Sequence, residues 1–409
     1  MTNTNRYSPV CRKGIFLYDF FSPFIRHLTR FTVFVMLAVA CRQKTANNGH
    51  DSDYQGEPLF KDTIRINHSK GFTLRYFSNF KLLKILNQFA DKADTLTYVL
   101  VQRGTPVPAG FPAAQVIRVP VQKMVITSSM HVGMLDYLDA VDVVSGLSEF
   151  KYISSPAVRK KVAAGKVAEV GNGSTLNDEL LISMHPGLVM TMGSPAARFS
   201  RYQNLINTGI PVLINSEWLE TDPLGRSEWV KMMAALLNKE ALVNKKFAQV
   251  EQEYNRLKEL AAHVSAKPSV VIGMPFKGSW FVPDGDSYTT RFLQDAGASY
   301  RWADTKGTGS LALDFETVAP VALAADFWLN TGDVNSREDI TARDVRYTQF
   351  RPFKQGTVYN NNKRLNNIGA NDYWESGSVQ PQTILADLIR ILHPELLPAH
   401  ELVYYKQIK

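Results

Sequence analysis

The residues that could do chemistry in this chain are aromatic and amide side chains in loops, and no known catalytic motif accompanies them. The sequence has no Gly-x-Ser-x-Gly elbow, Walker A loop, HExxH pair or Gly-x-Gly-x-x-Gly fingerprint. The segment 171–175 is nearest to a phosphate loop, but no lysine follows in place, so we interpret it as a turn before a helix. His131 follows the first predicted core strand, which favours a place near a ligand over metal ligation. We therefore expect no enzymatic activity, no cofactor and no resident metal ion.

A Pro- and Gly-rich loop at 274–288 carries more aromatic side chains than it can bury by itself. Aromatic and amide groups recur at 300–302, 328–330, 359–363 and 371–375, with lysines close by. Large flat side chains bind planar ligands at a small entropic cost, which favours a bulky planar or macrocyclic ligand such as an anionic metal chelate. The alternative is core packing, most of all for Trp302 and Trp328. The predicted ligand-binding residues are Ser129, His131, Lys277, Trp280, Phe281, Tyr288, Asn330, Tyr359 and Trp374.

The elements that must position these residues alternate between strands and helices. Apolar, β-branched runs at 121–127, 141–145, 187–191 and 210–214 predict strands, and helices are expected at 155–164 and 176–184. The alternation resumes with strands at 269–273 and 326–329 and helices at 289–296, 316–324 and 382–392. This pattern is typical of parallel sheets covered by helices, so we predict an α/β protein with two Rossmann-like lobes.

One long helix is expected to join the lobes. Its apolar residues recur at intervals of four and three, which places them on one helical face. They are Val243, Phe247, Val250, Tyr254, Leu257, Ala261 and Val264. A continuous helix without Pro or Gly resists bending, so we expect only a small change in lobe angle when a ligand enters the cleft between the lobes.

The N-terminal end of the chain has the composition of a lipoprotein leader. Arg26 and Arg30 precede about ten apolar residues, and Cys41 follows in a lipobox-like Leu-Ala-Val-Ala-Cys. The run is too short for a membrane-spanning helix, which needs about 20 residues. A buried amphipathic segment with an accidental cysteine is the alternative. Residues 1–41 hold five basic residues and one acid, so they carry +4 of the net +8, and the remainder is too weakly basic to indicate a nucleic-acid partner.

These patterns divide the chain into six predicted segments. They are a signal peptide at 1–41 ending at a lipidated Cys41, a tether at 42–58, a β-rich extension at 59–115 with strands at 72–77 and 97–102, an N-terminal lobe at 116–225, a linker helix at 226–266 and a C-terminal lobe at 267–409.

At this point the chain resembles the periplasmic substrate-binding proteins of ABC importers for ferric siderophores, haem and cobalamin, in the class whose lobes are joined by one helix. The resemblance covers about residues 115–405, and several of its segments are similar to a Bacteroidetes-type subgroup. The matching segments are Leu176–Met190, with Gly187 where Asp is usual, Glu217–Val230, Phe276–Pro283, Asp295–Tyr300, Leu313–Glu316, Asn371–Glu375 and Leu385–Leu396.

The resemblance implies capture of a chelate in the periplasm and delivery to a permease pair driven by an ATPase. By their positions in the matching segments, Glu179 and Glu316 resemble the carboxylates that dock on the permease. A monomer anchored to a bacterial membrane by its lipid is expected, with no nucleic-acid partner. Haem or cobalamin are alternative ligands to a siderophore. A direct metal-ion binder and a chelate-processing enzyme remain as other classes; the enzyme would require His131 to hydrogen-bond with Ser128 or Ser129.

Overall fold

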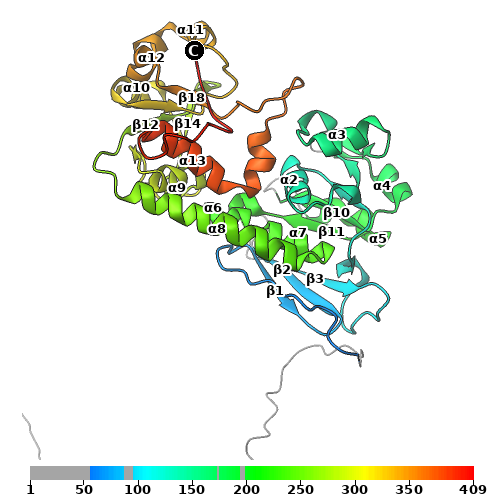
Figure 1. Ribbon diagram of the computed structural model, residues 1–409. Helices are drawn as coiled ribbons and strands as arrows, with labels where there is room; N and C mark the ends of the chain where they lie inside the picture. Colours follow the sequence, from blue (N-terminus) through cyan, green and yellow to red (C-terminus); the bar gives the residue numbers. More distant parts are fainter. Residues whose placement is uncertain (1–55, 87–94, 173–174, 194–198) are drawn as a thin grey trace, which may run out of the picture. The chain divides into compact units, whose positions relative to one another are not determined.

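The computed structural model describes residues 56–86, 95–172, 175–193 and 199–409 (Figure 1). The predicted signal peptide, Cys41 and most of the predicted tether lie outside these residues. Within the described part of the chain, none of the helices combines the length and apolar character that crossing a membrane requires.

The predicted β-rich extension is a four-stranded sheet in the order β1-β2-β3-β4. Its strands are β1 (Phe72–Tyr76), β2 (Phe80–Leu86), β3 (Thr95–Gln102) and β4 (Val116–Val119). The first three strands are antiparallel, while β4 runs parallel to β3 and leads into the N-terminal lobe. The strands predicted at 72–77 and 97–102 are confirmed, and β2 is a strand that the sequence pattern did not predict.

The N-terminal lobe is built on the parallel sheet β11-β10-β5-β6-β7. Its strands are β5 (Met124–Ile126), β6 (Val144–Leu147), β7 (Ala168–Glu169), β10 (Leu188–Met192) and β11 (Val212–Asn215). The helices between them are α2 (Ser129–Tyr137), α3 (Pro156–Ala163), α4 (Asp178–Met184) and α5 (Gln203–Asn207). The parallel α/β arrangement is as predicted, although β6 begins at Val144 and not at residue 141, because a 3₁₀ turn occupies Val141–Val143.

The linker predicted at 226–266 is three helices and not one. They are α6 (Pro223–Ser227), α7 (Val230–Leu237) and the long α8 (Glu240–Ala262). The break before α8 falls at Asn238, which ends α7 in the left-handed conformation with φ 53°. Asparagine tolerates this conformation better than most residues, so the continuous linker starts at Glu240 and not at residue 226.

The C-terminal lobe contains the sheet β15-β12-β17-β18-β19 and a smaller antiparallel sheet, β13-β14-β16. The strands of the larger sheet are β12 (Ser269–Ile272), β15 (Ser299–Tyr300), β17 (Phe327–Leu329), β18 (Val358–Asn360) and β19 (Lys406–Gln407). Those of the smaller sheet are β13 (Pro275–Phe276), β14 (Ser279–Pro283) and β16 (Ser310–Leu313). The helices are α9 (Tyr288–Asp295), α10 (Phe315–Ala324), α11 (Arg337–Arg343), α12 (Arg351–Gln355) and α13 (Pro381–Leu392), and α13 packs along α8 (Figure 1).

The buried face of α8 belongs to two hydrophobic cores in succession. Val243 and Phe247 lie in the core that includes the N-terminal sheets, whereas Val250, Tyr254 and Leu257 lie in a core of the C-terminal lobe. The predicted apolar face is therefore confirmed from Val243 to Ala261, whereas Val264 lies beyond the end of α8 at Ala262. One rigid element contributes to the packing of both lobes.

Candidate ligand-binding site

A pocket of about 170 Å³ lies at the carboxyl ends of β5 and β6 in the N-terminal lobe. The carboxyl ends of parallel strands are where open α/β sheets usually bind ligands. The side chains that line it are hydroxyls, apolar groups and one acid: Ile126, Thr127, Ser128, Ser129, Leu147, Ser148, Glu149, Tyr152 and Ile153. The Ser128 side chain caps α2 by accepting from the N–H of Met130, and the Ser148 hydroxyl donates to the carbonyl of Thr127 at 3.1 Å. We call this hollow the strand-end pocket.

Asn330 follows β17 at the matching edge of the C-terminal sheet. Its φ of 56° turns the chain away from the strand, while its N–H still donates to the Tyr359 carbonyl at 3.0 Å. The side-chain oxygen of Asn330 is buried and accepts no hydrogen bond from the described residues. Burial raises the pKa of Tyr405, and a hydrogen bond from the Asn330 side chain offsets part of this shift.

The two lobes meet through the segment 361–380, which belongs to the C-terminal lobe and packs on α2. Its 3₁₀ turns are η7 (Asp372–Trp374) and η8 (Ser376–Val379). Between them, the buried Glu375 carboxylate accepts from the backbone N–H of Ser154 at 2.7 Å and of Ser155 at 2.5 Å. Asn366 adds a bond from its side-chain amide to the carbonyl of Ile153. Three hydrogen bonds thus join this segment to the chain that lines the strand-end pocket.

A second interlobe contact places Arg226 of α6 against Tyr288 of α9. The guanidinium carbon lies 4.7 Å from the centre of the Tyr288 ring, a distance typical of cation–π contacts. Burial raises the pKa of Tyr288 to about 12, although the positive charge of Arg226 opposes the shift. On the other side, Arg226 lies 3.8 Å from the buried carboxylate of Glu217, whose pKa is raised by burial. Tyr288 therefore lies at the lobe junction, as part of a polar contact within the protein.

Trp280 is not at a ligand surface, which corrects the prediction. Its side chain has no exposed area, and its indole N–H donates to the carbonyl of Ile272 at 2.8 Å. It packs with Trp328 and Phe350 in an aromatic core of the C-terminal lobe. Alternation along β14 explains the result, because Trp280 points inward and Phe281 points outward with 47% of its surface exposed.

His131 is also withdrawn from the predicted site. It lies on α2 with no exposed surface, and neither ring nitrogen has a hydrogen-bond partner among the described residues. Burial lowers its pKa to about 3, so the ring is neutral at physiological pH. A ligand could reach this side chain only if α2 moved.

The other predicted residues are divided among different surfaces. Ser129 lines the strand-end pocket, and the half-exposed Trp374 directly precedes Glu375. Lys277 and Phe281 are exposed on or beside the hairpin β13–β14. Tyr359 lines a separate pocket of about 530 Å³ together with Arg390 and His400. The structure thus places Ser129 and Trp374 close to one interlobe contact, whereas Tyr359 contributes to another hollow.

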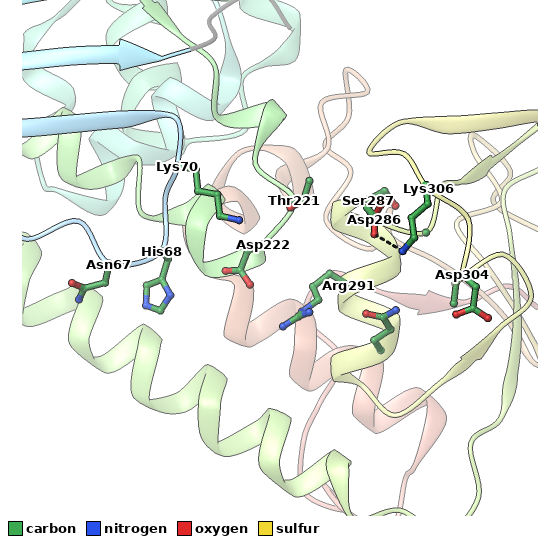
Figure 2. A pocket seen from close by; sticks show the side chains of 13 residues that line it. Asn67, His68, Lys70, Thr221, Asp222, Asp286, Ser287, Arg291, Asp304 and Lys306 are labelled. Atoms are coloured by element: carbon green, nitrogen blue, oxygen red, sulfur yellow. Dashed lines mark ion pairs between the residues drawn. The ribbon is translucent and has the colours of Figure 1, made fainter. Parts of the chain in front are cut away.

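A larger hollow, of about 580 Å³, is a less suitable ligand site (Figure 2). It is lined by the loop around His68 and by Asp222 on one side, and by Asp286, Arg291 and Lys306 on the other. Many of these charges already have partners. His68 contacts Glu251 at 2.5 Å, Asp286 contacts Lys306 at 3.7 Å, Arg291 contacts Asp295 at 3.4 Å, and Asp222 caps α6. We favour the strand-end pocket because it lies at the carboxyl ends of two neighbouring parallel strands, although its volume of about 170 Å³ holds only part of a chelate.

Glu179 and Glu316 are both exposed in the first turn of a helix. Glu179 lies on α4 and Glu316 on α10. A carboxylate at this position interacts favourably with the positive end of the helix dipole, and it remains accessible to a partner. Their predicted role in permease docking stays a prediction.

Sequence reasoning missed the residues that connect the lobes. Glu375 lay within a recognised segment, but its partners Ser154 and Ser155 are about 220 positions away. Tyr152, which is 53% exposed at the pocket, and Arg226 had no distinguishing sequence pattern. The sequence signal for this contact was an acid beside an aromatic residue, Trp374-Glu375. Only the tertiary fold shows that the acid connects the two lobes.

The two alternative classes gain no support from the described residues. Within them, no group of three or more His, Cys, Asp or Glu side chains is placed to hold a metal ion. The ring of His131 makes no hydrogen bond there to Ser128 or Ser129, the contact that a nucleophile–base pair would need.

Two α/β lobes that share a linker helix and meet beside a strand-end pocket define a solute-binding protein. The chain belongs to the periplasmic binding protein family, whose model matches residues 124–360. This confirms the family resemblance recognised in the sequence.

Relatives and solved structures agree with this assignment. An uncharacterized lipoprotein of Methanocaldococcus jannaschii is 28% identical over 293 residues, covering 69% of this chain and 67% of the relative. A second such lipoprotein is 25% identical over 351 residues, covering 82% and 87%. CeuE of Helicobacter pylori, as a Ni–His complex, has a TM-score of 0.53 at 16% identity, covering 78% of this chain and 91% of CeuE. A periplasmic heme-binding protein from Pseudomonas aeruginosa has a TM-score of 0.51 at 12% identity, covering 71% and 98%. At these identities the solved structures show a shared fold.

Proposed function

We propose that this protein captures a ferric chelate, a siderophore, in the periplasm and delivers it to the permease of an ABC importer. The observation that carries the proposal is the strand-end pocket, where hydroxyls and the exposed Tyr152 come from one lobe, beside a segment of the other lobe that presents Trp374. Hydroxyls and flat aromatic faces bind a preformed chelate, which already supplies its own metal ligands. Haem is the second candidate, since structural neighbours are named as heme-binding proteins. Cobalamin, a larger chelate with a planar macrocycle, remains an alternative.

A ligand screen by intrinsic fluorescence tests this function. We expect one of ferrioxamine B, a ferric catecholate, hemin and cyanocobalamin to bind saturably, with a Kd of about 1 μM or lower. Replacing Trp374 with Ala should weaken that binding about tenfold, because an exposed aromatic anchor is lost. Leu323→Ala is the control, since Leu323 is equally exposed but lies on α10, outside the segment 361–380 that contacts the chain beside the pocket. Saturable binding of none of the four would contradict the proposal.

We further propose that Glu179 and Glu316 contact the permease. Both carboxylates are exposed and lie on helices of different lobes, so each lobe would present one negative group. Charge-assisted contacts with permease arginines would align the two proteins.

A lipid on Cys41 is proposed to anchor the protein to a bacterial membrane. The lipobox-like sequence supports this, and so do the two relatives named as lipoproteins. Cys41→Ser is expected to move most of the protein from the membrane fraction to the soluble periplasmic fraction, as measured by immunoblotting. Cys11→Ser is the matched control and should leave the distribution unchanged. Retention of Cys41→Ser in the membrane fraction would exclude this anchor.

A further inference from the structure

Glu375 is a C-terminal-lobe residue whose carboxylate binds directly to the chain beside the strand-end pocket. Its two oxygens accept from the N–H groups of Ser154 and Ser155, which follow the pocket residues Tyr152 and Ile153. Ser155 also caps α3, so the carboxylate lies at the positive end of that helix. We call this contact the Glu375 bridge.

Contacts within the C-terminal lobe hold the residues that flank Glu375 in sequence. Asp372 pairs with Arg364, with 2.6 Å between the carboxylate oxygen and Nε, and also accepts from the Ser376 hydroxyl at 2.8 Å. That hydroxyl lies 2.9 Å from the hydroxyl of Tyr404. These bonds surround Glu375 on both sides in sequence, so its backbone position is set by the C-terminal lobe.

The backbone of Glu375 also contacts helix α2, whose first residue lines the pocket. Gly133 of α2 lies so close that a Cβ placed on it would be 2.1 Å from the Glu375 carbonyl oxygen. The same helix begins at Ser129, which lines the pocket. Glu375 therefore contacts α2 and residues 154–155, each of which continues a stretch of chain that lines the strand-end pocket.

Stability does not explain why an acid is found here. Burial raises the pKa of Glu375 to about 7, with added repulsion from Asp372 and Asp136, and the two N–H donors only partly offset the shift. An acid with a folded-state pKa above its unfolded value of 4.5 binds protons more tightly in the folded state. Its contribution to stability therefore decreases as the pH rises from about 4.5 to 7, so the ionised bridge destabilises the fold relative to the protonated form.

We propose that Glu375 is a positioning residue for the ligand site, whose carboxylate holds Ser154 and Ser155, and through them Tyr152 and Ile153, in the ligand-binding arrangement. This inference rests on the proposed function, because it assumes that the ligand occupies the strand-end pocket. The ionised carboxylate presents an acceptor to each N–H, whereas the side chain of Gln offers one acceptor oxygen and an NH₂ group that opposes the second donor.

Hydrogen exchange measured by mass spectrometry tests the bridge without a ligand. In Glu375→Gln, amide exchange in the peptide that contains Ser154 and Ser155 should be about tenfold faster than in the unaltered protein at pH 8. Glu338→Gln, an exposed acid on α11, should leave it unchanged. Thermal melting at pH 8 should show no loss of stability in Glu375→Gln, which separates positioning from a structural role. Unchanged exchange, or a loss of stability that accounts for faster exchange throughout the lobe, would overturn the proposal.

The consequence for the ligand is tested by measuring affinity for whichever of the four probes, ferrioxamine B, a ferric catecholate, hemin or cyanocobalamin, binds best. Glu375→Gln should weaken it about tenfold at pH 8, and Glu375→Asp, which keeps the charge, should recover part of the loss. The pH dependence of the bridge also reflects the charged groups on the elements packed around it. These are Asp136 of α2, Arg159 of α3, Arg226 of α6 and the pair formed by Asp372 and Arg364.

The pH dependence of ligand affinity is the third measurement. The unaltered protein should lose up to about tenfold in affinity between pH 8 and 6, measured relative to Glu375→Gln so that titration of the probe cancels. Equal affinity and equal pH dependence in both proteins would overturn the proposal. If no probe binds the unaltered protein, the proposed function fails, and the exchange experiment alone then decides whether Glu375 positions this wall.

Discussion

Replacing Lys81 with Ala is expected to lower the free energy of unfolding by about 3–5 kcal/mol, because it leaves a buried acid unpaired. Lys81 lies on β2 of the extension with no exposed surface. Its ammonium group donates to the carbonyl of Ala235 and the side-chain oxygen of Asn238, each at 2.7 Å, and pairs with Glu240. These three acceptors lie where α7 ends and α8 begins. One cation thus joins the extension to the start of the linker helix.

Chemical denaturation monitored by circular dichroism measures this loss. Lys84→Ala is the matched control, since Lys84 lies on the same strand but is exposed, and it should change stability by less than about 0.5 kcal/mol. A double replacement, Lys81→Met with Glu240→Gln, should be less destabilising than Lys81→Ala, because no buried charge then remains unpaired. Equal effects of Lys81→Ala and Lys84→Ala would show that the buried pair contributes nothing.

Elements with a regular polar and apolar alternation were predictable from the sequence. The apolar face of α8 follows the helical repeat and is buried as expected. Strand β2 was missed because Lys81, one of its inward residues, is charged and interrupts the alternation. Helix α2 was missed because it lacks the polar face that marks an amphipathic helix. Its residues Met130–Leu135 are all buried, so it has no polar face, and Gly133 is required by the close approach of Glu375 and not by the helix.

Of the predicted ligand-binding residues, Ser129 is the one that lines the strand-end pocket as described, and the pocket is lined mainly by hydroxyl and apolar groups. Alternation along β14 requires that one of Trp280 and Phe281 point inward, but the local sequence does not say which. Trp280 and Trp374 were both predicted as ligand-binding residues, but Trp280 is buried and Trp374 is exposed. The Glu375 bridge joins residues about 220 positions apart, so no local pattern could predict it.

Replacing Glu228 with Gln is expected to lower the free energy of unfolding by about 3–5 kcal/mol at pH 7, because Lys231 would lose its buried partner. The Glu228 carboxylate is buried at the start of α7 and lies 2.7 Å from the Lys231 ammonium. It also accepts from the backbone N–H groups of Asn67 at 3.0 Å, His68 at 2.8 Å and Ser69 at 2.7 Å. Glu228 therefore secures the first part of the loop that precedes β1, while Glu220 accepts from the N–H groups of Lys70 at 2.9 Å and Gly71 at 2.8 Å.

The pH dependence of this effect has a definite sign. Burial alone would raise the pKa of Glu228, but hydrogen bonds from Lys231, Asn67 and Ser69 outweigh burial, so the pKa lies below its ordinary value of 4.5. The folded state then binds this proton less tightly than the unfolded state, and the stabilisation is complete above pH 4.5 and lost as the pH falls through the folded-state pKa. The difference in stability between Glu228→Gln and the unaltered protein should thus shrink in acid. Glu259→Gln, an exposed acid on α8, should show only a small difference at every pH. A constant difference for Glu228→Gln from pH 7 to 3 would mean that its charge is not what secures the loop.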